Sequence, residues 1–174
     1  MVMSFALFIV GTSHTLQCSS GGTAPEKAAA YRVELQRLCL AHGVARLAEE
    51  MSKDGLQHQG VSHTVGYEVA AALGIEHQHV ELELLEQHAL GLGDATTINV
   101  LQSGYANVEE FRRRLTILLD DVRERCWIGR ILAGQTWPAL FVCGADHVES
   151  MARLWGSLDF PAVILHADLD PLVL

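Results

Sequence analysis

The sequence is short of positive charge. Lysine and arginine total 12 residues against 21 aspartates and glutamates, which leaves a net charge of −9 at pH 7 and a pI near 5.4. A surface of this sign repels a phosphate backbone, so we expect no binding of nucleic acid. The one basic cluster, Arg112-Arg113-Arg114, is interpreted as a solvated helix face.

A long hydrophobic run is also missing. The first ten residues, Met1 to Val10, look superficially like a signal peptide. They have no positively charged start, however, and the apolar run is too short for a spanning helix. We therefore interpret this segment as the first strand and expect no membrane association.

Cysteine is sparse and shows no metal-binding or redox spacing. None of the four cysteines lies in a Cys-x-x-Cys pair, and most have apolar neighbours. This pattern is typical of buried free thiols in a reducing compartment, so the expected location is the cytoplasm. The four residues are Cys18, Cys39, Cys126 and Cys143.

No internal repeat, linker or break in composition divides the 174 residues, of which 49% are apolar and 19% charged. The length suits one core, so residues 1–174 are predicted to form a single α/β domain. Apolar runs separated by helix-length segments predict a mostly parallel central sheet flanked by helices, with a site at the carboxyl ends of the strands. The expected strands are 5–10, 44–48, 77–82, 139–143 and 162–166.

Helix start and stop signals place the intervening helices. A capping box at Thr23–Glu26 predicts a helix ending at Gly43, and Ser62 is expected to cap a helix that Gly74 stops. Asn107 is expected to cap a long helix that ends near Gly134. A short helix is expected over 148–155. Residues 51–61 are predicted to be a loop, 83–106 give no clear element, and 91–97 are interpreted as a flexible or lid-like loop.

The most informative feature is a short pattern, Gly-x-x-His, that twice follows an apolar run. Gly11-Thr12-Ser13-His14 follows the first predicted strand, and Gly144-Ala145-Asp146-His147 follows the fourth. An apolar run closed by glycine is typical of a buried strand that turns into a loop. If both loops leave the same sheet edge, the two histidines meet over one ligand or metal ion.

Three further matches to the pattern end at His58, His63 and His77, but none follows a strong apolar strand. We treat these as accidental. His77 and His79 form an i, i+2 pair that would share one strand face and offers a second, weaker metal hypothesis. Each histidine also has a plain structural interpretation, a hydrogen bond to nearby backbone.

Acidic and basic residues near the motifs complete a candidate site. Glu49 and Glu50 end the second strand, but alternation cannot decide which points inward when a strand is buried on both faces. Asp146 is interpreted as a ligand, an orienting group or, most simply, a helix cap. Arg123 and Arg125 flank the apolar stripe of the long helix, and either is a candidate to stabilise oxyanion charge.

These motifs together resemble the Tiki/TraB, erythromycin-esterase and ChaN-like superfamily of α/β proteins. Its members carry two Gly-x-x-His motifs, one near each end, with a glutamate and an arginine between them. The resemblance spans most of this chain in order, and the chain is shorter than several relatives. The matching segments are Gly11–His14, Glu49-Glu50, Arg123-Glu124 with Trp127, and Leu140–His147.

The resemblance implies a compact α/β domain with hydrolytic activity, either metal-dependent peptide cleavage or metal-independent ester cleavage; one branch is associated with haem. The leading hypothesis is therefore a small hydrolase of an ester or peptide bond. Its candidate catalytic residues are His14, Glu49, Glu50, Arg123, Arg125 and His147. Candidate ligands for a divalent ion (zinc, manganese or cobalt) are His14, His147, Glu50 and Asp146.

Two alternatives stay open. The same pocket would suit a non-catalytic module that binds a small ligand or haem, and fold alone does not decide between them. A catalytically silent protein that assembles with a partner, including a homo-oligomer, is the third hypothesis. Three tryptophans are compatible with such an interface and equally with the core; they are Trp127, Trp137 and Trp155.

Overall fold

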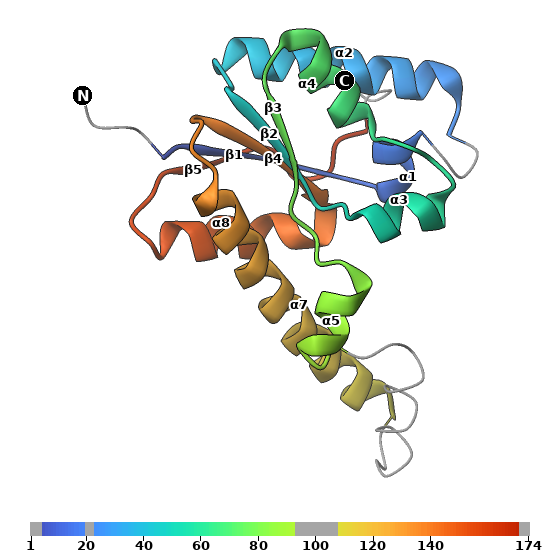
Figure 1. The fold of residues 1–174 in the computed structure, drawn as a ribbon. Coiled ribbons are helices and arrows are strands. Elements are labelled where there is room, and N and C mark those ends of the chain that lie inside the picture. Colours follow the sequence, from blue (N-terminus) through green and yellow to red (C-terminus); the bar gives the residue numbers. More distant parts are fainter. Residues whose placement is uncertain (1–4, 20–22, 93–107, 171–174) are drawn as a thin grey trace.

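A computed structural model describes residues 5–19, 23–92 and 108–170, and within them five parallel strands form one sheet in the order β3-β2-β4-β1-β5 (Figure 1). The strands are β1 (Leu7–Thr12), β2 (Arg46–Glu49), β3 (Glu76–His79), β4 (Ala139–Gly144) and β5 (Ala162–His166). The helices are α1 (His14–Cys18), α2 (Pro25–Ala41), α3 (Lys53–Gln59), α4 (Val65–Leu73), α5 (Leu84–Ala89), α7 (Val108–Ala133), the 3-10 turn η1 (Ala145–His147) and α8 (Val148–Gly156). The predicted α/β class with a parallel sheet is confirmed.

The sheet is buried on both faces, as the continuous apolar runs of β1 and β4 require. Successive strand residues alternate between two cores. Val10 and Leu47 pack with α2 and α4 on one face, whereas Ile9 and Ala48 pack with α7 and α8 on the other. Figure 1 shows α2 and α4 on one side of the sheet and α7 and α8 on the opposite side.

Several predicted boundaries were wrong because local hydrogen bonds compete with simple sequence signals. The predicted loop 51–61 contains α3, whose first turn is capped by the Ser52 side chain, which accepts from Gly55 N–H. Thr64 rather than Ser62 caps α4. Helix α2 starts at Pro25, and its N-cap residue Ala24 makes no side-chain cap hydrogen bond. The Thr23 hydroxyl donates to the carbonyl of Thr15.

The third strand is shorter than predicted and ends at His79. Two short helices, α1 and α5, were not predicted at all. Both are too short to show helical periodicity in the sequence. The predicted cap Asn107 and residues 93–97 of the predicted lid lie outside the described residues.

Helix α7 buries a different face from the one its sequence suggested. Buried side chains in its C-terminal half include Trp127, Ile128 and Ile131, whereas Val122 and Cys126 of the predicted stripe are only partly buried. Figure 1 gives the reason, because the N-terminal half of α7 extends beyond the sheet and only the C-terminal half packs against it. Across the described part of the chain, no helix combines the length and apolarity that a membrane crossing demands.

Candidate active site

The two Gly-x-x-His motifs meet at one edge of the sheet. Strands β1 and β4 are adjacent and parallel, with Thr12 opposite Gly144, so both following loops leave at the carboxyl edge. The Nε2 atom of His14 lies 3.5 Å from Oε1 of Glu50, and Nε2 of His147 lies 3.7 Å from the same oxygen. The two imidazoles therefore converge on one carboxylate.

Glu50, and not Glu49, is the acid of this group. Consecutive residues leave a strand on opposite faces. Glu50 shares the face of Ala48, which packs with α7 and α8, while Glu49 shares the face of Leu47, which packs with α2 and α4. We call Glu50, His14, His147, Arg123, Glu81 and Glu124 the Glu50 cluster.

The Glu50 carboxylate is buried and held by strong donors. Its side chain is 1% exposed; Oε1 accepts from Arg123 Nη2 at 2.9 Å and Oε2 from Gly144 N–H at 2.7 Å. Burial alone would raise the pKa of Glu50. Hydrogen bonding to His14, the charge of His147 and the Gly144 amide outweigh burial, so the pKa lies below its ordinary value. Glu50 is therefore an anion held in place.

Arg123 ties several acids together. Besides Glu50, its guanidinium donates to Glu81 and, at 3.2 Å, to Asp120, and it lies 4.9 Å from the centroid of the Trp127 ring. Burial lowers the pKa of Arg123, but the hydrogen bond to Glu81 and the charges of the acidic neighbours raise it by a larger amount. The pKa therefore lies above its ordinary value, and the group stays charged. By contrast, Arg125 points away, pairs with Asp121 at 2.9 Å and has a side chain that is 63% exposed.

His147 is oriented by a second carboxylate. Its Nδ1 atom lies 2.8 Å from Oε1 of Glu124, which also accepts from Ser150 Oγ at 2.6 Å. The Trp127 ring meets the imidazole edge-on, with centroids 5.0 Å apart. Burial lowers the pKa of His147, but the Glu124 hydrogen bond and the charge of Glu50 raise it above its usual value. A carboxylate on Nδ1 fixes the tautomer and leaves Nε2 as the reactive nitrogen.

Asp146 does not cap helix α8, which was the simplest of the roles predicted for it. Its side chain is exposed in η1, and helix α8 has His147 at its N-cap position with no side-chain cap hydrogen bond. None of the contacts of Glu50, His14 and His147 given above involves Asp146.

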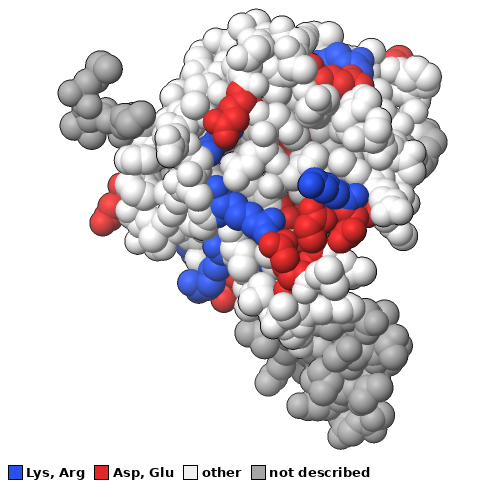
Figure 2. All heavy atoms as spheres, in the orientation of Figure 1, with Lys and Arg blue, Asp and Glu red and all other residues white. Residues whose placement is uncertain are grey.

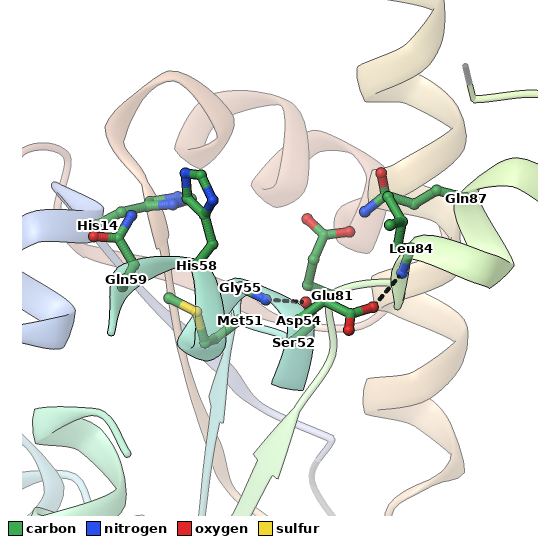
Figure 3. A pocket seen from close by; sticks show the side chains of 10 residues that line it. All are labelled: His14, Met51, Ser52, Asp54, Gly55, His58, Gln59, Glu81, Leu84 and Gln87. Carbon is green, nitrogen blue, oxygen red and sulfur yellow. Dashed lines mark hydrogen bonds between the residues drawn. The ribbon is translucent and has the colours of Figure 1, made fainter. Parts of the chain in front are cut away.

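A cavity of about 410 Å³ opens beside the Glu50 cluster, and His14 and Glu81 contribute to its wall. Figure 3 shows His14 with His58 at one end of this cavity and Gln87 at the other, with Glu81 between them. The His14 side chain is 46% exposed. Its hydrogen bond to Glu50 raises the pKa of His14 above its usual value.

The cavity wall is strengthened by contacts between α3 and the start of α5. Glu83 accepts from the backbone N–H groups of Lys53 and Asp54, and Asp54 accepts from Leu84 N–H. Figure 2 shows acidic side chains gathered between α3 and α5. A second cavity of about 270 Å³, which shares Gln87, is lined by Arg123 and Asp120.

A second group, which we call the Glu49 cluster, lies on the opposite face of the sheet. It contains Glu49, Thr64, His77 and His79. Nε2 of His77 is hydrogen-bonded to Oε2 of Glu49 at 2.7 Å, and the Thr64 hydroxyl donates to the same oxygen. One ligand atom each from Glu49, His77 and His79 lies within 4.8 Å of the others, so these three residues could hold a metal ion.

Cys143 lies beneath the Glu50 cluster, next to Gly144 at the end of β4, and is fully buried. Burial, together with the charges of Glu50 and Glu124, raises the pKa of its thiol well above the usual value. The thiol is therefore held in its neutral form.

Sequence reasoning did not assign roles to Glu81 and Glu124. Both are buried acids, and each had a usable signal. Glu81 follows the third strand at the same edge as Glu50. Glu124 adjoins Arg123 and precedes Trp127 by three residues, which is close to one helical turn. The comparisons with protein-family models, with curated proteins and with solved structures find no match to this chain.

Proposed function

We propose that this chain is a small hydrolase that cleaves an ester or peptide bond at the Glu50 cluster. One observation carries the proposal: two imidazoles converge on a buried carboxylate, and one of them is oriented by a second carboxylate. Such a carboxylate–imidazole pair is the arrangement by which enzymes position a general base. The adjoining cavity is where a small-molecule or peptide substrate would bind.

In this proposal His147 is the general base. Glu124 accepts a hydrogen bond from the Nδ1–H group, which leaves the Nε2 lone pair free to take a proton from water. The attacking water oxygen forms a bond to the substrate carbonyl carbon, and the C=O electron pair moves onto the carbonyl oxygen. When this oxyanion collapses, the bond from the carbonyl carbon to the ester oxygen or amide nitrogen breaks, and the proton on His147 passes to that leaving atom. His14, at the cavity wall and 3.5 Å from Glu50, would donate a hydrogen bond to the developing oxyanion.

Arg123 acts as a positioning residue in this scheme. Its donors are directed at Glu50, Glu81 and Asp120, so it neutralises the acids around the site. This differs from the oxyanion role that the sequence suggested for it. Arg125, at the surface with Asp121, has no part in the mechanism.

The expected metal set of His14, His147, Glu50 and Asp146 fits an ion poorly. Both oxygens of Glu50 already accept hydrogen bonds, one of them from a guanidinium that a cation would have to displace. Asp146 contributes no nearby oxygen to the contacts described above. We therefore propose direct activation of water by His147, without zinc, manganese or cobalt at this cluster.

The test is a screen of nitrophenyl esters and fluorogenic peptides with protein kept in EDTA. For any substrate found, His147→Gln should lower kcat by about 10²–10⁴-fold, the usual worth of a positioned general base. Glu124→Gln should lower it by a smaller factor. The control is His42→Gln, because His42 follows α2 at the opposite end of the strands and packs on Phe8.

Two results would refute this function: equal turnover by wild type and His147→Gln, or loss of activity in EDTA that added metal restores. If no substrate is turned over, the alternative is a binding module in the same cavity. A ligand-induced rise in melting temperature that survives Glu50→Gln would favour that alternative, and a Soret band would identify haem as the ligand.

A further inference from the structure

We propose that the Glu49 cluster is a binding site for a divalent transition-metal ion of the Zn²⁺ type, held by Glu49, His77 and His79. Two imidazole nitrogens and one carboxylate oxygen are a donor set that zinc prefers. The three donors already lie within 4.8 Å of one another. Small side-chain rotations would bring them to one ion.

The sheet itself arranges these ligands. Strands β2 and β3 pair in parallel with Glu49 opposite His79. His77 lies two residues before His79 and therefore points to the same face. Their rings meet edge-on, with centroids 4.7 Å apart. Ligands on paired strands are held more rigidly than ligands on loops, which reduces the entropy lost when an ion binds.

Two buried atoms of the cluster that could ligate a metal have no hydrogen-bond partner in the part of the chain that the structure describes. Glu49 is fully buried; Oε2 takes both hydrogen bonds, and Oε1 has none. Nε2 of His79 is also buried without a partner. Buried polar atoms are normally satisfied because desolvating them is costly. A cation between the carboxylate and the imidazoles would give these two buried atoms a partner.

Helix α4 leaves room for the carboxylate at Gly66. A Cβ atom at this position would lie only 2.5 Å from Cδ of Glu49 and 2.6 and 2.7 Å from its two oxygens. The backbone of α4 thus covers the carboxylate closely, and Thr64 fixes one oxygen. This second-sphere support is typical of groups that orient a metal ligand.

The cluster has an open side. Strand β3 is at the edge of the sheet, and the His77 side chain is 12% exposed, so an ion can enter there. Three protein ligands leave one position of a tetrahedral ion for water. The site lies on the sheet face opposite the Glu50 cluster, so occupancy here can be measured independently of hydrolysis.

The experiment uses the full chain after removal of metal with EDTA. Calorimetric titration with Zn²⁺ should give one site per chain, and saturation at 100 times Kd should raise the melting temperature by roughly 5–10 °C. His79→Gln and Glu49→Gln should each weaken binding by about tenfold or more. The matched controls His147→Gln and His63→Gln should bind like wild type.

A readout without substitutions covers the case in which a variant does not fold. Zn²⁺ should protect His77 and His79 of the wild type from diethylpyrocarbonate, as mapped by mass spectrometry, and leave His63 reactive. Three results would overturn the proposal: no Zn²⁺ binding at micromolar concentrations, no protection of His77 and His79, or binding that is lost in His147→Gln but kept in His79→Gln.

Discussion

Glu49 and Glu50 are neighbours in the chain, yet they lie in opposite surroundings. Glu50 accepts hydrogen bonds on both oxygens from an arginine and a backbone amide. Glu49, equally buried, accepts from Thr64 and His77 on one oxygen, and its other oxygen has no partner among the residues that the structure describes. The strand geometry alone separates them, because β2 sends consecutive side chains to opposite faces of the sheet.

The difference teaches what each face is suited to do. A carboxylate already neutralised by a guanidinium is an anchor that keeps nearby imidazoles in place. A buried carboxylate that has one oxygen without a partner among the described residues, beside two imidazoles, is suited to bind a cation. The first arrangement fits the proposed proton transfer, and the second fits the proposed metal site.

The largest expected effect comes from removing the cation on the Glu50 side. Arg123→Met would leave Glu50 and Glu81 buried without their guanidinium partner, which costs about 3–5 kcal/mol of the free energy of unfolding. Arg125→Met, two residues away on the same helix, removes only an exposed pair with Asp121 and should cost less than about 1 kcal/mol. Urea denaturation of both variants measures the contrast; equal losses would show that Arg123 is not a buried anchor.

An intermediate effect is expected from adding one methyl group on each side. Gly66→Ala places a Cβ within 2.5 Å of the Glu49 carboxyl carbon. Such overpacking costs about 1–3 kcal/mol, of which the helix propensity of alanine returns up to about 1 kcal/mol. The comparison is Gly144→Ala, whose Cβ would lie 3.4 Å from Glu50 Oε2 and should change stability by less than about 0.5 kcal/mol. Thermal unfolding would contradict this ordering if Gly144→Ala were the more damaging change.

The smallest effect is a pH dependence from the Glu50 side. The folded state raises the pKa of His147 above 6.5 despite its burial, through Glu124 and Glu50. Its stabilisation is therefore fully present below pH 6.5 and is lost as pH rises through the folded-state pKa. From about pH 6.5 upward, the free energy of unfolding of the wild type should fall relative to that of His147→Gln. Urea denaturation at several pH values tests this, with His42→Gln as control; a parallel course of wild type and His147→Gln would contradict it.

The overall fold could be predicted because its signals are local. Two apolar runs form buried parallel strands, as expected: one contains Gly11 near its end, and the other ends at Gly144. Adjacent parallel strands then bring His14 and His147 to one edge. This required no knowledge of side-chain contacts, only that the two strands are neighbours.

The faces of the site could not be predicted in the same way. Choosing Glu50 over Glu49 needs the positions of the helices on each side of β2, because both faces are buried. Choosing Arg123 over Arg125 needs the buried face of α7, which is set by where that helix crosses the sheet. The apolar stripe predicted from the sequence covers both halves of the helix, including the N-terminal half, which extends beyond the sheet.

Partners across the fold were the hardest to predict. The shared strand face of His77 and His79 follows from their spacing, but Glu49 joins them only through the register of β2 against β3. Glu124 and Glu81 are buried acids, which sequence rules assign to the surface. Their burial is explained only by contacts with His147 and Arg123.

The depth of Cys143 determines how the chain responds to alkylating reagents. Iodoacetamide needs an accessible thiolate, and Cys143 is fully buried with a pKa well above the usual value. Burial also raises the pKa of Cys18 to about 11 and of Cys39 to about 12. Of the four cysteines, only Cys126, which is partly buried, is accessible to a brief treatment with iodoacetamide. The proposed hydrolysis should therefore persist after alkylation, unlike that of an enzyme with a cysteine nucleophile.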